Sequence, residues 1–235
     1  MTAAEVVEEL RAMGKDSIKK VLMNHGIPEP LIGVKVEDLK KIQKRVKKDY
    51  QLSLDLYDTG IYDAMYLAGL VAEDAKMTKK DLQNWANGAT CEAMCSNIVA
   101  WVAAESNHGW EMGLKWIDSK KPTIAISGWG TLGGVVSITP DEELDLPAIK
   151  QMLQRIQKTI HDQPNRVRYA MNYFVIAVGC YVTSLTEMAL QVGEKIGKVE
   201  VDMGETACKV PAIKDYIQKV KDRGNLGKKR KTMKC

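Results

Sequence analysis

The sequence predicts an all-α fold, a HEAT-like helical-repeat solenoid (α–α superhelix), and two observations lead to this. Apolar residues recur at helical spacing through almost the whole chain, and the segments end at capping residues, glycines or prolines. Moderately polar segments alternate with nearly all-apolar ones, as expected when each helical pair buries one helix against its neighbour. Because the segments share no visible fixed sequence period, an irregular α-helical bundle is the alternative.

The helices expected in the first half of the chain follow from their caps and apolar faces. Thr2 and Glu5 form a capping box at the first of them. Residues 36–46 carry lysines opposite an apolar face, whereas residues 61–72 and 90–105 are apolar over most of their surface and are expected inside the protein. In chain order, the expected segments end at Gly14, His25, Val46, Gly60, Ala72, Asn87 and Glu105.

The helical order continues in the second half, up to residue 196. The first residue of the last expected helix is Pro211, whose fixed φ suits a helix start, and this helix ends at Gly224. Between residue 105 and Pro211, the expected helical segments are residues 110–117, 123–138, 148–160, 166–182 and 185–196.

One of these segments contains a glycine pattern typical of dinucleotide-binding loops. Gly128–Gly133 reads GxGxxG and follows a short apolar stretch. A βαβ unit needs a second buried strand, but Val135–Ile138 runs directly into Thr139-Pro140 and an acidic loop. We therefore predict a helix whose glycines let neighbouring helices approach closely, and we expect no nucleotide cofactor.

Residues 197–210 depart from the helical pattern. Val199, Val201 and Met203 alternate with polar residues, and Gly204 can supply a turn before the chain runs back to Val210. This pattern predicts a short β-hairpin at about 198–209, which either connects two helices or inserts into a partner. The predicted organisation is one HEAT-like domain over residues 1–224, followed by a basic, disordered tail at 225–235.

Composition is that of an ordinary globular protein, with 45% hydrophobic and 27% charged residues among 235 and a net charge of +4. No apolar run reaches membrane-spanning length, and acids occupy the first residues in place of a basic leader. We therefore expect a cytoplasmic protein without a membrane segment. The cysteines are expected to be reduced and to form no metal site, because they are odd in number and lack paired CxxC spacing: Cys91, Cys95, Cys180, Cys208 and Cys235.

Candidate catalytic residues are few, since the chain has no HExxH, P-loop or GxSxG motif. Glu92 lies early in a very apolar helix, where a carboxylate is either a partner for the helix dipole or an acid of a site. It is a weak catalytic candidate, and the structural role is favoured. Asp63 is expected to be a surface acid. The tryptophans are more simply explained as bulky core residues than as stacking platforms for bases.

Three segments resemble the DNA alkylation repair family, the AlkD-like HEAT-repeat proteins. They are Asp81–Asn97, Lys115–Ile117 and Arg166–Val182, and the stretch Gly197–Pro211 (GKVEVDMGETACKVP) is similar to the hairpin of the AlkF-like branch. The resemblance implies an all-helical solenoid whose concave basic face holds duplex DNA. In the glycosylase branch, that face excises cationic alkylpurines.

The catalytic pattern of that glycosylase branch is absent. Its members carry Trp-Asp-x-x-Asp, whose second Asp is the catalytic carboxylate, but this chain reads Cys-Glu-Ala-Met-Cys at residues 91–95. Their concave-face arginine falls near Ser127, and their second tryptophan falls at Tyr173. The AlkF-like resemblance therefore implies a protein that binds branched or distorted DNA without glycosylase activity. An alkylpurine glycosylase with an altered site and a protein-binding helical scaffold are the alternatives.

The residues expected to contact DNA are basic or aromatic. They are Lys198, Lys209, Arg166, Arg168, Lys115, Lys120, Lys121, Tyr173, Lys228, Lys229, Arg230 and Lys231.

Overall fold

The computed structural model of the protein describes residues 1–204 and 206–234 and is helical throughout most of that range. Glu205, in the expected hairpin, and the expected thiol of Cys235 lie outside the described residues. The α-helices are α1 (Ala3–Met13), α2 (Asp16–Asn24), α3 (Val36–Val46), α4 (Tyr50–Asp58), α5 (Tyr62–Val71), α6 (Lys79–Gly88), α7 (Ala100–Glu105), α8 (Gly109–Trp116), α9 (Pro122–Ile138), α10 (Leu146–Thr159), α11 (Asn165–Tyr181), α12 (Thr186–Ile196) and α13 (Ile213–Asp222).

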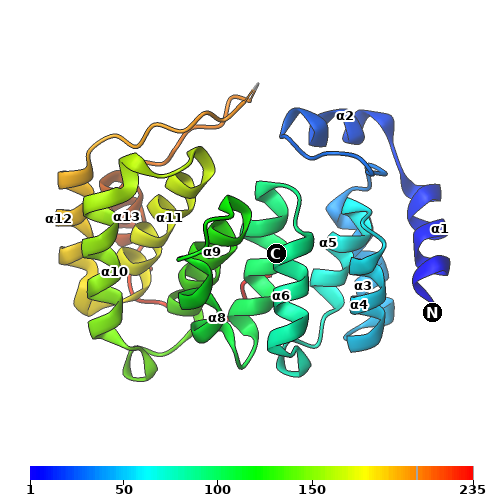
Figure 1. Ribbon diagram of the computed structural model, residues 1–235, viewed down its shortest axis with the longest axis horizontal. Helices are drawn as coiled ribbons and strands as arrows, with labels where there is room; N and C mark the ends of the chain where they lie inside the picture. The colour runs from blue at the N-terminus through cyan, green and yellow to red at the C-terminus, as the bar shows by residue number, and fades with distance from the viewer. Residues whose placement is uncertain (205, 235) are drawn as a thin grey trace.

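Most helices lie side by side between α1 at one end of the molecule and α12 at the other, as Figure 1 shows. One row consists of α5, α7, α9 and α11, in which α9 packs against both α7 and α11. We call these four helices the inner row. Other helices pack against it, with α4 on α5, α8 on α9, and both α12 and α13 on α11. This arrangement confirms the all-helical class predicted from the alternation of apolar and polar segments.

Local sequence signals account for where several helices begin. Thr2 and Glu5 make the expected capping box at α1, and Thr78 and Asp81 make a second one at α6. Each box satisfies backbone N–H groups that the first turn of a helix leaves without partners.

Helix α9 confirms the helical interpretation of the glycine-rich stretch. Residues 125–137 are buried along its whole circumference. A Cβ atom on Gly128 would lie 2.7 Å from the backbone nitrogen of Ile117 and 2.9 Å from the carbonyl carbon of Trp116. The missing side chain therefore allows α8 to approach the backbone of α9, which explains why the helix tolerates a residue of poor helix propensity.

Replacing Gly128 by alanine is expected to lower the free energy of unfolding by about 2 kcal/mol, because the new methyl group meets backbone atoms that cannot move independently. Chemical denaturation followed by circular dichroism measures this change. Gly88→Ala is the matched control, since its Cβ would meet a single side-chain atom of Tyr57 at 3.3 Å. Equal stability of the two variants would contradict the close approach of α8 and α9.

Asp63 is buried, with 1% of its surface exposed, so its expected place on the surface is wrong. Its carboxylate accepts hydrogen bonds from the backbone N–H groups of Ile32, Gly33 and Val34, at 2.6, 3.2 and 2.7 Å for the nearer oxygen in each case. These three groups belong to the connector between α2 and α3. The carboxylate therefore fastens that connector to α5, and the buried charge is compensated by its donors.

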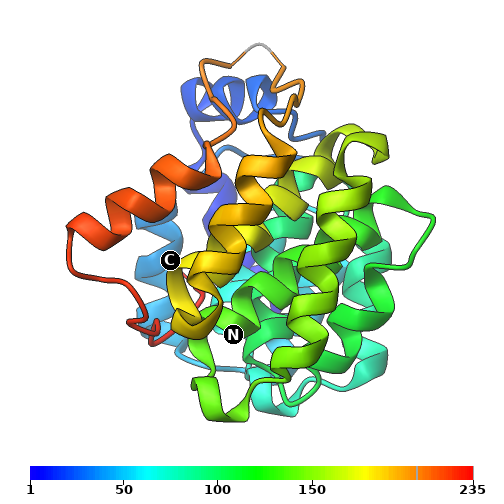
Figure 2. The ribbon, with the colours of Figure 1, turned by 90° about the vertical axis from the view of Figure 1, so that its left-hand side faces the viewer.

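Residues 198–204 and 206–209 belong to an extended segment, which we call the arm, and this corrects the expected β-hairpin. No strand occurs within residues 1–204 and 206–234. The arm projects from the end of α12 in Figure 1, and Figure 2 shows its two limbs apart. Its polar groups bond to other partners: the Asn165 side chain exchanges two hydrogen bonds with the backbone of Asp202, at 2.7 and 2.9 Å. The alternation of apolar and polar residues therefore does not by itself produce a β-ladder between the two limbs.

Residues 225–234 lie against the inner row, whereas the sequence predicted a disordered tail. The Nζ atom of Lys229 donates to the carbonyl of Val136 and pairs with Asp141, each at 2.8 Å. Met233 and Lys234 are 5% and 8% exposed. Basic residues at a chain end are usually solvated, but here they meet carbonyl groups at helix ends, where positive charge is favoured.

No single helix in the described ranges is long and apolar enough to cross a membrane. Helix α11 and the segment Thr183–Ile196 meet the length and hydropathy test as a pair, but the pair is bent by 116°.

Candidate functional site

A cavity of about 490 Å³ opens beside the inner row, and α11 provides one of its walls. Arg166, Tyr169 and Tyr173 line it from this helix. They are three and four residues apart, so they occupy one face of an otherwise apolar helix. Burial raises the pKa of Tyr173 to about 12 and also raises the pKa of Tyr169, to which the Glu92 carboxylate contributes. Both phenols are therefore neutral near pH 7.

The opposite wall comes from the helix that leads into α7. A π-helical segment, Met94–Val99, interrupts its α-helical pattern. Such wide turns frequently occur at functional sites. Glu92, Ser96, Asn97 and Trp101 line the cavity from this side, and the Ser96 hydroxyl donates a hydrogen bond to the Glu92 carboxylate. The Trp101 ring, in turn, packs edge-on against Tyr66 at a centroid distance of 5.7 Å.

The arm, the C-terminal residues and His25, which follows α2, complete the cavity. Met203, Thr206 and Cys208 line it from the arm, while Arg230 and Met233 line it from the C-terminal residues. The Arg166 guanidinium lies 3.2 Å from the Met203 sulfur, which connects α11 to the arm. Cavities of roughly 300–1,000 Å³ with a few convergent polar groups are typical of ligand sites. Aromatic faces and guanidinium groups are suited to planar bases and phosphates.

Cys95 and Ser127 do not line this cavity. Both side chains are fully buried, and burial raises the pKa of the Cys95 thiol to about 12 against a smaller lowering by its hydrogen bond with Ser127. Glycosylases of the resembling family are expected to have a catalytic aspartate at the first position and an arginine near the second. Here the two positions pair with each other in the core, and neither can present a charge to a ligand.

The predicted site residues fall into three groups. Glu92, Arg166, Tyr173 and Arg230 meet at the cavity just described. Arg168, Lys198 and Lys209 lie on the other side of the arm, where they line a second cavity of about 920 Å³ between the arm, α11 and α12. The third group lines neither cavity, and its members are Lys115, Lys120, Lys121, Lys228, Lys229 and Lys231.

Several members of the third group already have protein partners. The Nζ atom of Lys121 donates to the carbonyl of Asn87 at 3.1 Å, and that of Lys228 donates to the Asn225 side chain at 3.2 Å. Lys115, Lys120 and Lys231 are exposed. DNA binding by these lysines therefore stays a prediction, and any such contact would lie outside the cavity.

Sequence reasoning missed Tyr169, Ser96 and Asn97, and it placed Trp101 simply in the core. Trp101 is 9% exposed and borders the cavity. Tyr169 could have been found from its spacing to Arg166 and Tyr173, which marks a polar stripe on an apolar helix. Nothing local indicates the π-helical turn.

The thiols described by the structure are free. Cys91, Cys95 and Cys180 are buried, and Cys208 is exposed on the arm. Burial raises the pKa of Cys180 to about 11 and also raises the pKa of Cys91, so these buried thiols are poor nucleophiles.

Together, the stacked helices define a helical-repeat protein, and the aromatic, basic cavity beside its inner row is the candidate site. Residues 6–198 match the model of the family described as DNA alkylation repair enzyme. The chain belongs to this family.

Comparison with individual proteins agrees over nearly the full length. The uncharacterized protein Lin0241 of Listeria innocua is 32% identical over 231 residues, which cover 96% of this chain and 100% of that protein. The uncharacterized protein Lmo0209 of Listeria monocytogenes is 32% identical over 229 residues, which cover 95% and 99%. One solved structure matches with a TM-score of 0.92 and 34% identity over 100% of both chains. It is described as belonging to a new family related to the HEAT-like repeat DNA glycosylases, with affinity for branched DNA structures. The fold is therefore HEAT-like.

Proposed function

We propose that this protein binds branched or distorted DNA at the inner-row cavity and the arm, and does not excise bases. One observation carries the proposal: the cavity combines aromatic rings and guanidinium groups with the arm, whereas the position of the catalytic aspartate is the buried Cys95. An unpaired or unstacked base at a branch can stack on Tyr169, Tyr173 or Trp101. Arg166 and Arg230 can bind the adjoining phosphates.

The described affinity of the similar solved structure for branched DNA supports the same reading. Binding to DNA implies a location in contact with the genome, so we keep the cytoplasmic location expected from the sequence as part of the proposal. The alternative of a protein-binding scaffold lacks a specific surface in its favour.

Gel shifts with a four-way junction, a bubble and a linear duplex of equal length test the proposal. At a fixed salt concentration, we expect the junction and the bubble to bind about tenfold more tightly than the duplex, because the bubble contains unpaired bases and base stacking in the junction is interrupted at its branch point. Tyr169→Ala should remove most of that preference, while Tyr216→Ala, an exposed tyrosine on α13, should retain it. Equal and negligible affinity for all three DNAs would refute DNA binding.

The same preparations test the altered-site glycosylase, which one observation favours: Glu92 places a carboxylate in the cavity. Glu92 already accepts a hydrogen bond from Ser96, and Ser127 stands where an arginine is expected in the glycosylases. Both features argue against Glu92 as the catalytic acid. We expect no release of methylated purines from alkylated DNA with excess protein. Release that Glu92→Gln abolishes would replace the proposal by the enzyme.

A further inference from the structure

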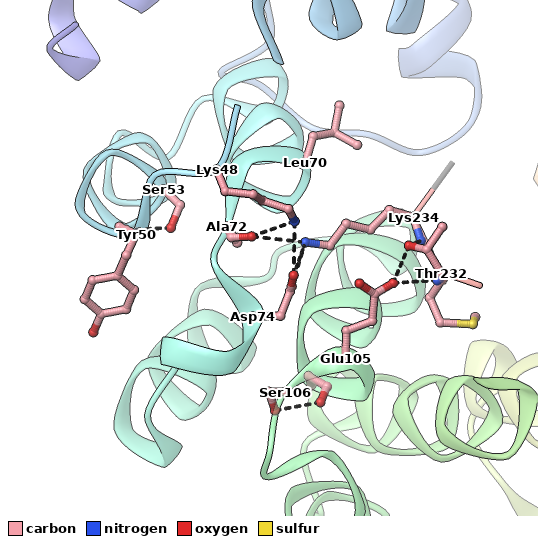
Figure 3. Close-up of polar contacts among 12 residues, drawn as sticks. Lys48, Tyr50, Ser53, Leu70, Ala72, Asp74, Glu105, Ser106, Thr232 and Lys234 are labelled. Atoms are coloured by element: carbon pink, nitrogen blue, oxygen red, sulfur yellow. Dashed lines mark hydrogen bonds and ion pairs between the residues drawn. The ribbon is translucent and has the colours of Figure 1, made fainter. Parts of the chain in front are cut away.

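Two carboxylates beside the inner row have partners within the protein, as Figure 3 shows. Asp74 pairs with Lys234 at 2.6 Å and with Lys48 at 3.1 Å. Glu105 accepts two hydrogen bonds, each at 2.5 Å, from the hydroxyl and N–H groups of residues 232–233. Both acids are therefore compensated by donors of the chain itself, as acids withdrawn from water require.

The Glu92 carboxylate differs from these two, because it lies in the inner-row cavity without a cation. Its Oε1 atom accepts a hydrogen bond from the Ser96 hydroxyl. Among the residues that the structure describes, none forms an ion pair with it, although Arg166 and Arg230 line the same cavity. A carboxylate repels the phosphates of DNA, so this group opposes binding through the backbone. It is suited instead to accept hydrogen bonds from the N–H groups of a base.

The π-helical turn adds a second polar side chain to this wall. Residues five apart point in different directions on an α-helix, because one turn takes about 3.6 residues. The wide turn at Met94–Val99 contains a longer hydrogen bond, from the Ala100 N–H to the Cys95 carbonyl. Asn97 lines the cavity together with Glu92. Within the described part of the chain, the Asn97 side-chain amide forms no hydrogen bond, so it can bind a ligand.

Aromatic rings border the same cavity. Burial raises the pKa of the Tyr169 phenol, and the nearby Glu92 carboxylate raises it further. Trp101 follows Asn97 by about one helical turn and also lines the cavity. A base that stacks on one of these rings therefore has a carboxylate and an amide in the same cavity to meet its edge.

Guanine is the base whose edge matches these two groups. Its N1–H and N2–H donors are adjacent, and a carboxylate accepts such a pair in a fork of two charge-assisted hydrogen bonds. The O6 acceptor lies beside them and suits the NH2 group of an amide. Adenine and cytosine each offer one amino group next to an acceptor nitrogen. Thymine offers one N–H between two carbonyl oxygens, which a carboxylate repels.

We propose that the cavity selects guanine among unstacked bases, with Glu92 accepting hydrogen bonds from N1–H and N2–H and Asn97 donating to O6. The hydrogen bond from Ser96 occupies one lone pair of the carboxylate and leaves the others for the base. The negative charge also disfavours a phosphate at this wall, so a strand enters with its base toward Glu92. The DNA context rests on the proposed function, whereas the preference for guanine is a property of the cavity alone.

Two duplexes with an unpaired loop in one strand test the preference. The loop holds a single guanine among thymines in one duplex and thymines only in the other. At a fixed salt concentration, gel shifts should show about tenfold tighter binding of the guanine loop, the worth of one charge-assisted hydrogen bond. A loop with hypoxanthine, which lacks the N2 amino group, should bind with intermediate affinity. A loop with 1-methylguanine, whose N1 carries no hydrogen, should bind no better than thymine.

Glu92→Gln should abolish the preference, because an amide offers one acceptor and one donor where guanine has two donors. Binding of the thymine loop should stay equal or become tighter, since a negative charge is removed. Asn97→Ala should lose part of the preference. Glu142→Gln, an exposed acid outside the cavity with the same change of charge, is the control and should keep it. The readout is a ratio of two affinities of one preparation, so a smaller folded fraction does not change it.

Equal affinity of the wild type for the guanine and thymine loops would overturn the selection of guanine and leave the proposed function in place. If the wild type binds neither loop, the proposed function fails, and saturation-transfer NMR with the free mononucleotides GMP and TMP then tests the cavity alone. GMP should receive the stronger saturation from the wild type, and Glu92→Gln should remove the difference. Equal transfer to both nucleotides would overturn the inference.

Discussion

Replacing Asp63 by alanine is expected to lower the free energy of unfolding by about 3 kcal/mol or more, since it leaves buried backbone N–H groups without an acceptor. The carboxylate serves three consecutive N–H groups, from Ile32 to Val34, in the connector between α2 and α3. This connector has no regular hydrogen-bond ladder of its own, and Gly33 has a φ of +89°. Urea denaturation followed by circular dichroism measures the loss.

Two further variants separate the acceptor from the charge. Asp63→Asn keeps one oxygen and should recover part of the loss, because one carbonyl can still accept two hydrogen bonds. Asp58→Ala removes an exposed carboxylate four positions before the start of α5 and should change the free energy of unfolding by less than about 0.5 kcal/mol. If Asp63→Ala were as stable as Asp58→Ala, the connector would be held by its apolar contacts, chiefly Leu31 and Val34, which are 5% and 3% exposed.

Asp63 also illustrates what a sequence can and cannot predict. Capping boxes such as Thr2 with Glu5, and the apolar length of α9, are local signals, and the helices they predict are present. The partners of Asp63 lie 29–31 residues away, so its burial depends on a tertiary contact that no local pattern reports. Solvated acids are the usual case, and that expectation failed where a loop needed an acceptor.

The arm and residues 225–234 were mispredicted for the same physical reason. Alternating residues at 199–203 favour an extended chain, and the arm is extended. A hairpin additionally needs a ladder between its limbs, but the Asn165 side chain binds the backbone of Asp202 instead. Basic residues at 228–231 suggest a solvated tail, but the carbonyls of Val136 and Ser137 at the end of α9 accept hydrogen bonds from the Lys229 side chain and the Arg230 backbone N–H. In both cases the deciding partners are distant in sequence.

The candidate site was partly predictable. The family resemblance pointed to Arg166, Tyr173 and the arm, and the side-chain spacing on α11 contains the information for Tyr169. Neither the resemblance nor the spacing on α11 could indicate that Arg230 lines the cavity, because no sequence pattern near Arg230 predicts that residues 225–234 pack against the inner row.

Replacing the arm, residues 198–209, by a short Gly/Ser linker is expected to weaken junction binding by about tenfold or more and linear-duplex binding by much less. The arm lines both cavities: Met203 and Cys208 border each of them, so it separates the space above α11 into two compartments. A branch point presents two strands that diverge, and an element between two compartments can hold them apart. Gel shifts at fixed salt measure both affinities, and thermal unfolding checks that the loss of Val199, 6% exposed, leaves the fold intact.

The charge of the arm must be separated from its shape. Lys198 and Lys209 are exposed and flank its limbs, and Lys198 is already paired with Glu200 at 2.9 Å, so its attraction for phosphate is partly offset. A Lys198→Gln, Lys209→Gln double variant keeps the arm and removes both charges. Charges at the surface act on every DNA alike, so this variant should weaken junction and duplex binding by a similar factor and reduce the salt dependence of both. If it instead reproduced the selective loss caused by the linker, preference for the junction would come from the two lysines, and the arm would be a support that positions them.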